Sequence, residues 1–337
     1  MQIKEARHQY ISDGNTIKWS HEGKRYCLVI RNDDNADSPR SWDNLAVMAC
    51  WHRRYNLGDK IDETDPEVFW RHLVRDHCTT EEVVEAIKAG KLGGFRLEPS
   101  EGAPGMYDIY ETYYIRTVIG RSEPSESLEY EQIPEDQIPD YVLDDLNIEH
   151  CQTLLEPYFE WLPLWLYDHS GITMSCGARS GQYADRWDSG QVGWIIAEKE
   201  KIMRETVGYV LDEKGQRIKE EHVHQNGTVT WGYKTEPLTE ETWRARAIEI
   251  MEGEVEDYDT YLRGEVYGYI LYELGDDPEE DSEETAEEID SCWGFYGDDL
   301  LENGIPDNCG CGLYEALQSG EYEEGSVSSR SYSYLIF

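Results

Sequence analysis

The chain has 337 residues, and its 71 Asp and Glu against 30 Lys and Arg give a formal charge of −41 at pH 7. Proteins grip DNA and RNA with Lys and Arg that displace counterions from the phosphates, so this composition excludes a conventional nucleic-acid binder. Apolar residues make up 39% of the chain and include 11 Trp and 24 Tyr, which excludes disorder throughout. The charge favours a partner with a basic surface, although a halophilic origin would also explain it.

The chain carries no sign of a membrane segment or a leader. No run approaches the ~20 apolar residues that a membrane helix needs. The N-terminal sequence MQIKEARHQY also lacks the apolar stretch of a signal peptide. We therefore expect a cytoplasmic protein that contacts no membrane.

Residues 1–97 are predicted to form an N-terminal α+β module. The segment KRYCLVIRN at 24–32 predicts a strand. Apolar residues recur at helical spacing in WDNLAVMACWHRRY and predict a helix over 42–55. Two further helices are expected from Asp65-Pro66 and from Thr80, because these residue types are typical of helix starts.

Residues 98–153 are predicted to form an acidic connector of strand and loop. The segment MYDIYETYYIRTVIG at 106–120 is rich in Tyr and β-branched residues, which predicts a strand. Residues 122–150 hold ten acids, three prolines and no Lys or Arg. We expect them to form an exposed loop or a short helix near 141–146.

Residues 154–337 are predicted to form an antiparallel β-rich domain with helices and an acidic surface. Two apolar segments, 161–177 and 186–202, predict buried strands. Turn signals within 206–233, among them Asn226-Gly227, predict a meander of antiparallel strands.

The end of this domain is expected to return to the same alternation of helix and strand. A helix should start at Thr239 and break near Gly253. The segments VYGYILYEL and EIDSCWGFYG predict two more strands. The predicted fold class is α+β, mostly antiparallel sheet with flanking helices and a strongly acidic C-terminal half.

The negative charge is concentrated in the last third of the chain. Residues 251–330 hold twenty-five acids against Arg263 and Arg330, a net charge of −23. Carboxylates held by a rigid aromatic core can take the place of duplex phosphates and meet the Lys and Arg that normally grip them. A merely solvated acidic face is the alternative. The expected partner-binding residues are Glu123, Glu126, Glu129, Glu131, Asp276, Asp277, Glu279, Glu280, Asp281, Glu283, Glu284, Glu287, Glu288, Asp298 and Asp299.

An enzymatic alternative rests on the similar segments Asp168-His169-Ser170-Gly171 and Asp188-Ser189-Gly190. A metal-dependent hydrolase would use Asp168, His169 and Asp188, with the ion attracted by the negative field. Neither serine lies in a Gly-x-Ser-x-Gly elbow, and Asp-Ser-Gly is typical of tight turns. The turn interpretation is therefore preferred, and no catalytic residue is assigned.

Basic residues and cysteines offer weaker signals. The best basic cluster, His52-Arg53-Arg54, is expected to form internal salt bridges because the surrounding field repels anions. Cys309 and Cys311, with Cys292, would supply zinc ligands only in an unusual Cys-x-Cys arrangement. We expect reduced thiols and no cofactor, and metal binding by these three cysteines stays an open question.

Several ordered segments resemble a family of uncharacterised proteins from bacteriophages and mobile elements. They are SPRSWDNLAVMACWHRRYNLGD at 38–59, then PLWLYDHSGITMS, RWDSGQVGWI, EGEVEDYDTYLRGEVYGY and EIDSCWGFYG. The resemblance covers most of the chain and implies a phage accessory protein with no established reaction. It transfers no catalytic set.

Charge and resemblance together predict a phage-encoded, non-catalytic inhibitor in the host cytoplasm. It would act as an acidic mimic of nucleic acid in a basic groove of a host nuclease or defence complex, with no direct contact to nucleic acid. A structural accessory protein, whose acidity only prevents aggregation, remains a third possibility.

Overall fold

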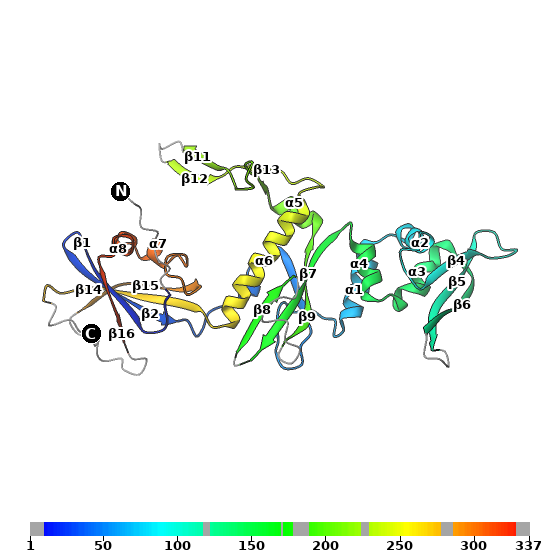
Figure 1. The fold of residues 1–337 in the computed structure, drawn as a ribbon, viewed down its shortest axis with the longest axis horizontal. Coiled ribbons are helices and arrows are strands. Elements are labelled where there is room, and N and C mark those ends of the chain that lie inside the picture. The colour runs from blue at the N-terminus through cyan, green and yellow to red at the C-terminus, as the bar shows by residue number, and fades with distance from the viewer. Residues whose placement is uncertain are drawn as a thin grey trace.

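The computed structural model describes residues 10–116, 122–169, 171–177, 189–223, 229–277 and 286–327. All strand pairings in this part of the chain are antiparallel, and helices flank the sheets, which confirms the predicted α+β class. The molecule is elongated, with a five-stranded sheet at one end, a four-stranded sheet in the middle and a three-stranded sheet at the other end (Figure 1).

The five-stranded sheet joins the two ends of the chain, in the order β15-β14-β2-β1-β16. Its strands are β1 (Asn15–His21), β2 (Lys24–Asn32), β14 (Val266–Leu274), β15 (Glu287–Tyr296) and β16 (Tyr322–Ser326). The predicted strands at 24–32, 266–274 and 288–297 are confirmed. Helices α7 (Ile305–Cys309) and α8 (Leu313–Ser319) pack on one face and bury Ile305 and Leu313 against the sheet.

The four-stranded sheet has the order β3-β9-β7-β8. Its strands are β3 (Ala46–Cys50), β7 (Phe159–Asp168), β8 (Ile172–Cys176) and β9 (Ser189–Glu198). Helix α5 (Lys199–Glu205) follows β9, and the long helix α6 (Trp243–Leu262) crosses the sheet. Residues three and four apart form the buried stripe of α6, since these positions lie on one helix face: Trp243, Ala247, Met251, Val255 and Tyr258.

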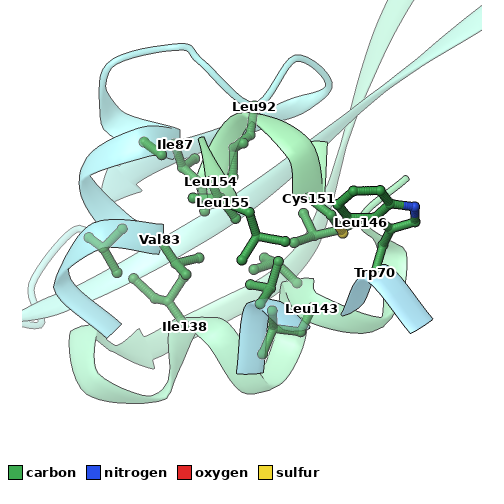
Figure 2. Close-up of a cluster of buried hydrophobic side chains, with 14 of the residues drawn as sticks. Trp70, Val83, Ile87, Leu92, Ile138, Leu143, Leu146, Cys151, Leu154 and Leu155 are labelled. Carbon is green, nitrogen blue, oxygen red and sulfur yellow. The ribbon is translucent and has the colours of Figure 1, made fainter. Parts of the chain in front are cut away.

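The third unit packs four helices beside the sheet β4-β5-β6. Its strands are β4 (Phe95–Pro99), β5 (Met106–Arg116) and β6 (Ser122–Pro134), and its helices are α1 (Pro66–His77), α2 (Thr80–Lys88), α3 (Ile138–Val142) and α4 (Ile148–Leu155). Figure 2 shows the core between the helices, with Trp70 at its edge and Leu155 and Leu146 inside it. Asp65 caps α1, and α2 starts at Thr80 as predicted, with its cap one residue earlier at Thr79.

A β-arm leaves the middle of the molecule between α5 and α6 (Figure 1). Its root pairs β10 (Gly208–Tyr209) with β13 (Thr235–Glu236), and its outer part pairs β11 (Lys219–Val223) with β12 (Val229–Tyr233). These strands agree with the predicted meander. The predicted Asn226-Gly227 turn lies outside the described residues.

The helix predicted over 42–55 is wrong, because this segment contains β3. Pairing between distant residues overrides the local periodicity. β9 pairs with one edge of β3. On the other edge Met48 N–H donates to Asp59 Oδ2 at 2.8 Å, and the Met48 carbonyl accepts from Asp59 N–H at 2.8 Å.

The loop predicted from residue 122 is also wrong, because residues 122–134 form β6. This strand lies at the edge of its sheet and pairs only with β5, so its polar residues and its terminal Pro124 and Pro134 are tolerated. The short helix expected near 141–146 is found slightly earlier, as α3. Helix α6 is not broken at Gly253, since the buried stripe continues through that turn.

Strand pairing crosses the boundaries that we predicted at residues 97 and 153. β2 pairs with β14, and β3 pairs with β9, so residues 1–97 do not form a module by themselves. Helices α1 and α2 share their core with α3 and α4 from the predicted connector.

Among the described residues, no helix combines the length and the apolar character needed to cross a membrane.

Candidate interaction surface

Some carboxylates of this chain are held in buried ion pairs. The Arg40 side chain, 4% exposed, donates to Asp59 through Nε and Nη2 at 2.8 and 2.7 Å, and to Glu254 Oε2 through Nη1 at 2.8 Å. Glu254 Oε1 also accepts from the backbone N–H groups of Leu45 (2.8 Å) and Ala46 (3.2 Å). These two carboxylates fix the chain around residues 40–59 onto α6, and each of their oxygens already accepts a hydrogen bond from within the chain.

The carboxylates at the start of β15, in contrast, are not held in buried ion pairs. Among the described strands, β15 pairs only with β14 and is therefore an edge strand, and its first residues, Glu287 and Glu288, are exposed. Neither has an ion pair within the described part of the chain. No Lys or Arg occurs in the sequence between Arg263 and Arg330. These carboxylates are therefore available to cations of another molecule.

A buried tyrosine supports the acidic edge. The ring of Tyr269 lies in the core beneath β14, and its hydroxyl donates to Asp290 Oδ2 at 2.6 Å. The side-chain amide of Asn308, on α7, lies 2.8 Å from the same hydroxyl. Burial, and then the hydrogen bond to Asp290, raise the pKa of Tyr269, so the hydroxyl stays a donor. The carboxylate of Asp290 is thus tied to the core rather than free to rotate.

An aromatic residue fixes the other end of β15. Trp293 lies opposite Gly268 of β14, and its indole occupies the space where a side chain at 268 would begin. Trp293 is still 48% exposed. Tyr267 and Tyr269 on β14 and Trp293 and Phe295 on β15 place aromatic rings beside the acids of this edge.

The predicted acids of β6 do not join this surface. β6 lies at the opposite end of the elongated molecule from β15 (Figure 1). Glu126 is paired with Arg96, with 2.7 Å between Oε2 and Nη2, whereas Glu129 and Glu131 are exposed. For Glu123 the structure gives only the backbone, in β6. The two acidic segments therefore form separate surfaces.

The remaining predicted acids near β15 differ in their roles. Asp276 and Asp277 are exposed just after β14. Asp299 is a turn residue, since its Oδ1 accepts from Leu301 N–H at 3.0 Å, and Asp298 is half-buried, with its carbonyl accepting from Ile11 N–H at 2.7 Å. Five predicted residues lie outside the described residues: Glu279, Glu280, Asp281, Glu283 and Glu284.

Two acids that we did not select from the sequence lie at the opposite edge of the same sheet, Glu321 just before β16 and Glu323 on it. Glu321 and Glu323 are exposed and form no ion pair among the described residues. The segment GEYEEGS was the available signal, because it lies within the region of net charge −23.

Asp168, which the enzymatic alternative would use, already has side-chain partners within the chain. Arg54 forms an ion pair with it, and the Tyr55 hydroxyl lies 3.3 Å from Asp168 Oδ1. His169 N–H donates to the Gly171 carbonyl at 3.0 Å, which is a turn contact as expected for Asp-x-x-Gly. Asp188 lies outside the described residues.

The basic cluster borders two adjoining cavities of about 770 and 530 Å³, which share Trp51, His52 and Arg53. His52 stacks on Tyr55, with 5.1 Å between ring centroids. Arg54 makes the predicted internal salt bridge, but Arg53 is exposed and has no ion pair in the described structure. The expectation of internal pairing holds for one of the two arginines.

The three cysteines suggested as zinc ligands all contribute to the core between the sheet and α7 and α8. Burial raises the pKa of Cys309 to about 12, so its thiol is protonated at neutral pH. In the described part of the chain, no three His, Cys, Asp or Glu residues are grouped as a metal site would require.

Comparison with known protein families, with curated proteins and with solved structures gives no match.

Proposed function

We propose that this chain is a non-catalytic inhibitor that binds a basic, nucleic-acid-binding groove of another protein through the β15 edge. The observation that carries the proposal is that Glu287 and Glu288 are exposed, lack cationic partners in the described structure, and lie on a strand held by a buried core. Arg and Lys form charge-assisted hydrogen bonds with carboxylates as they do with phosphates.

Rigid support distinguishes this surface from a solvated acidic tail. A flexible acidic segment loses affinity because binding must order it, whereas carboxylates on a strand are already placed. The Tyr269–Asp290 hydrogen bond and the packing of Trp293 on Gly268 provide this order. Some acids elsewhere are matched internally, as at Arg40 and Arg96, so acidity alone does not define the surface.

The identity of the target rests on the family resemblance. A phage accessory protein in a bacterial cytoplasm meets restriction nucleases and other defence complexes, whose basic grooves grip DNA or RNA. We therefore propose a host nuclease or defence complex as the partner. The ion pair of Arg54 with Asp168 gives no support to the alternative of a hydrolase.

The test is competition with DNA. The tagged chain is incubated at low salt with purified candidate nucleases and with host lysate, and bound proteins are eluted with duplex DNA. We expect the bound protein to be a nuclease or another DNA- or RNA-binding protein that duplex DNA releases, and its activity to fall when the chain is added.

Two matched variants locate the surface. Glu287→Gln with Glu288→Gln removes two free carboxylates from β15, and Glu129→Gln with Glu131→Gln removes two from β6 at the other end. Inhibition should weaken at least about tenfold with the β15 variant, as expected for loss of two interfacial charges, and stay unchanged with the β6 variant. Equal effects of the two variants, or a bound protein that DNA fails to release, would refute the proposal.

A further inference from the structure

The β-arm, residues 206–237, has no core of its own. None of its described residues is buried, and every residue from 211 to 221 is exposed. Among the described strands, β11 and β12 pair only with each other. An isolated two-stranded hairpin is marginally stable in water, so this outer part of the arm lacks the packing that normally maintains such a structure.

The root of the arm, in contrast, is firmly attached. The guanidinium of Arg217 lies 4.0 Å from the ring centroid of Tyr209 and 5.6 Å from that of Tyr233. Arg217 also forms an ion pair with Glu249 of α6. Arg246, on the same helix, lies 4.8 Å from the Tyr209 ring. These contacts hold the direction of the arm relative to the body, while its outer hairpin projects away from it (Figure 1).

The outer hairpin exposes large aromatic side chains on one face. Trp231 is 69% exposed and lies opposite Glu221, and Tyr233 lies opposite Lys219. Residues two apart on a strand share a face, so both aromatic rings are on the same side of the hairpin. Trp and Tyr contribute a large share of the binding energy at protein interfaces, and an unpacked face of this kind marks such an interface.

The charge of the arm differs from that of the rest of the molecule. Residues 207–237 contain four Lys and Arg against five Asp and Glu, while residues 251–330 carry −23. Lys214, Lys219 and Lys234 form no ion pair within the described structure. A surface with exposed aromatic rings and free lysines is complementary to one with exposed aromatic rings and free carboxylates.

The chain itself provides such a surface. β15 has an open edge, free carboxylates at Glu287 and Glu288, and exposed apolar side chains at Ile289 and Trp293. We infer that the arm of one copy docks on the β15 edge of a second copy, through Trp231, Tyr233 and the neighbouring lysines. Because the arm and the sheet are different surfaces, each copy offers one donor and one acceptor site, and the contact can close reciprocally in a dimer or continue into a larger ring.

This inference does not depend on the proposed inhibitor function, because self-association needs no host protein. It does use the same edge, so a basic partner should compete with it. Arm variants affect self-association without removing any β15 carboxylate, which keeps the two proposals separable.

The experiment is sedimentation velocity of the full chain at low salt, over about two orders of magnitude in concentration. We expect a species larger than the monomer that dissociates on dilution and in high salt. Trp231→Ser, and separately Lys219→Glu with Lys234→Glu, should each weaken self-association at least about tenfold. Lys91→Glu is the matched control, an exposed lysine on another unit, and should have no effect.

A charge swap decides where the arm docks. Glu287→Lys with Glu288→Lys, mixed with the Lys219→Glu and Lys234→Glu variant, should restore association between the two chains. Near-ultraviolet circular dichroism identifies any variant that has lost its fold. The Trp231→Ser variant is expected to stay folded because the arm contributes nothing to the cores. A wild-type monomer at every concentration, arm variants that associate normally, or a swap that restores nothing would overturn the inference.

Discussion

Arg40 shows how one residue decides the position of a long segment. Its guanidinium is almost fully buried and is neutralised by Asp59 and Glu254, which are distant from each other in the sequence. Replacement of Glu254 by Gln leaves the buried cation with one carboxylate, and we expect a loss of about 3–5 kcal/mol in the free energy of unfolding. Urea denaturation followed by tryptophan fluorescence measures it.

The exposed ion pair of Lys24 and Glu273, 2.8 Å long, is the control for this change. The same substitution, Glu273→Gln, removes a carboxylate whose partner is more than half exposed, and should leave the free energy of unfolding nearly unchanged because water and salt screen such a pair. If the two variants lose similar stability, the buried network does not anchor the segment.

Local patterns predicted the elements whose signals lie within a few residues. The helix starts at Asp65 and Thr80 were identified from residue types that cap helices, and the strand over 24–32 from its apolar, β-branched run. Residues 46–50 form a strand because they pair with β9 and hydrogen-bond to Asp59. These partners lie outside the short stretch of sequence from which a local pattern is read. β6 was hidden for a similar reason, since its partner β5 and its edge position make its polar residues acceptable.

The candidate surface was also predictable only in part, because its charge is visible in the sequence but the partners of each acid are not. The run of acids in residues 251–330 can be counted in the sequence, and it led to Glu287 and Glu288. Which acids are free depends on the tertiary partners of each, as Asp299 and Glu126 show. The separation of β6 from β15 depends on sheet order, which composition does not contain.

Helix α6 offers a test of the predicted break at Gly253. This glycine lies on the exposed side of a continuous helix, its φ is not positive, and an added methyl group would meet nothing within 4 Å. Gly253→Ala should therefore raise the free energy of unfolding by about 0.5–1 kcal/mol, because alanine loses less backbone entropy on folding. Thermal and urea denaturation both report this change.

Gly58 is the matched control, because alanine at this position should lower the free energy of unfolding. Its φ is +69°, and a side chain there would collide with the Met48 carbonyl oxygen beside β3. Gly58→Ala should lower the free energy of unfolding by more than about 1 kcal/mol. A destabilising Gly253→Ala would show instead that α6 requires flexibility at this turn.

The molecule as a whole combines internal repulsion with several separate hydrophobic cores. A formal charge of −41 repels itself most strongly in the folded state, where the carboxylates are closer together than in the unfolded chain. The elongated arrangement in Figure 1 keeps the acids of β6 and β15 apart, which lowers this repulsion between the ends. The remaining repulsion lies within each unit, over distances comparable with the ~10 Å Debye length at 0.1 M salt.

Added salt should therefore act in opposite directions on folding and on binding. Raising NaCl from low concentration to about 0.3 M screens the self-repulsion, so the thermal midpoint should rise. The same screening removes the attraction between the β15 carboxylates and a basic groove, so partner affinity should fall. Differential scanning calorimetry and a binding titration in matched buffers measure the two responses. A midpoint that falls with salt would mean that internal ion pairs such as Arg40–Glu254 outweigh the repulsion, and affinity that is unaffected by salt would mean that the carboxylates do not contact the partner's cations.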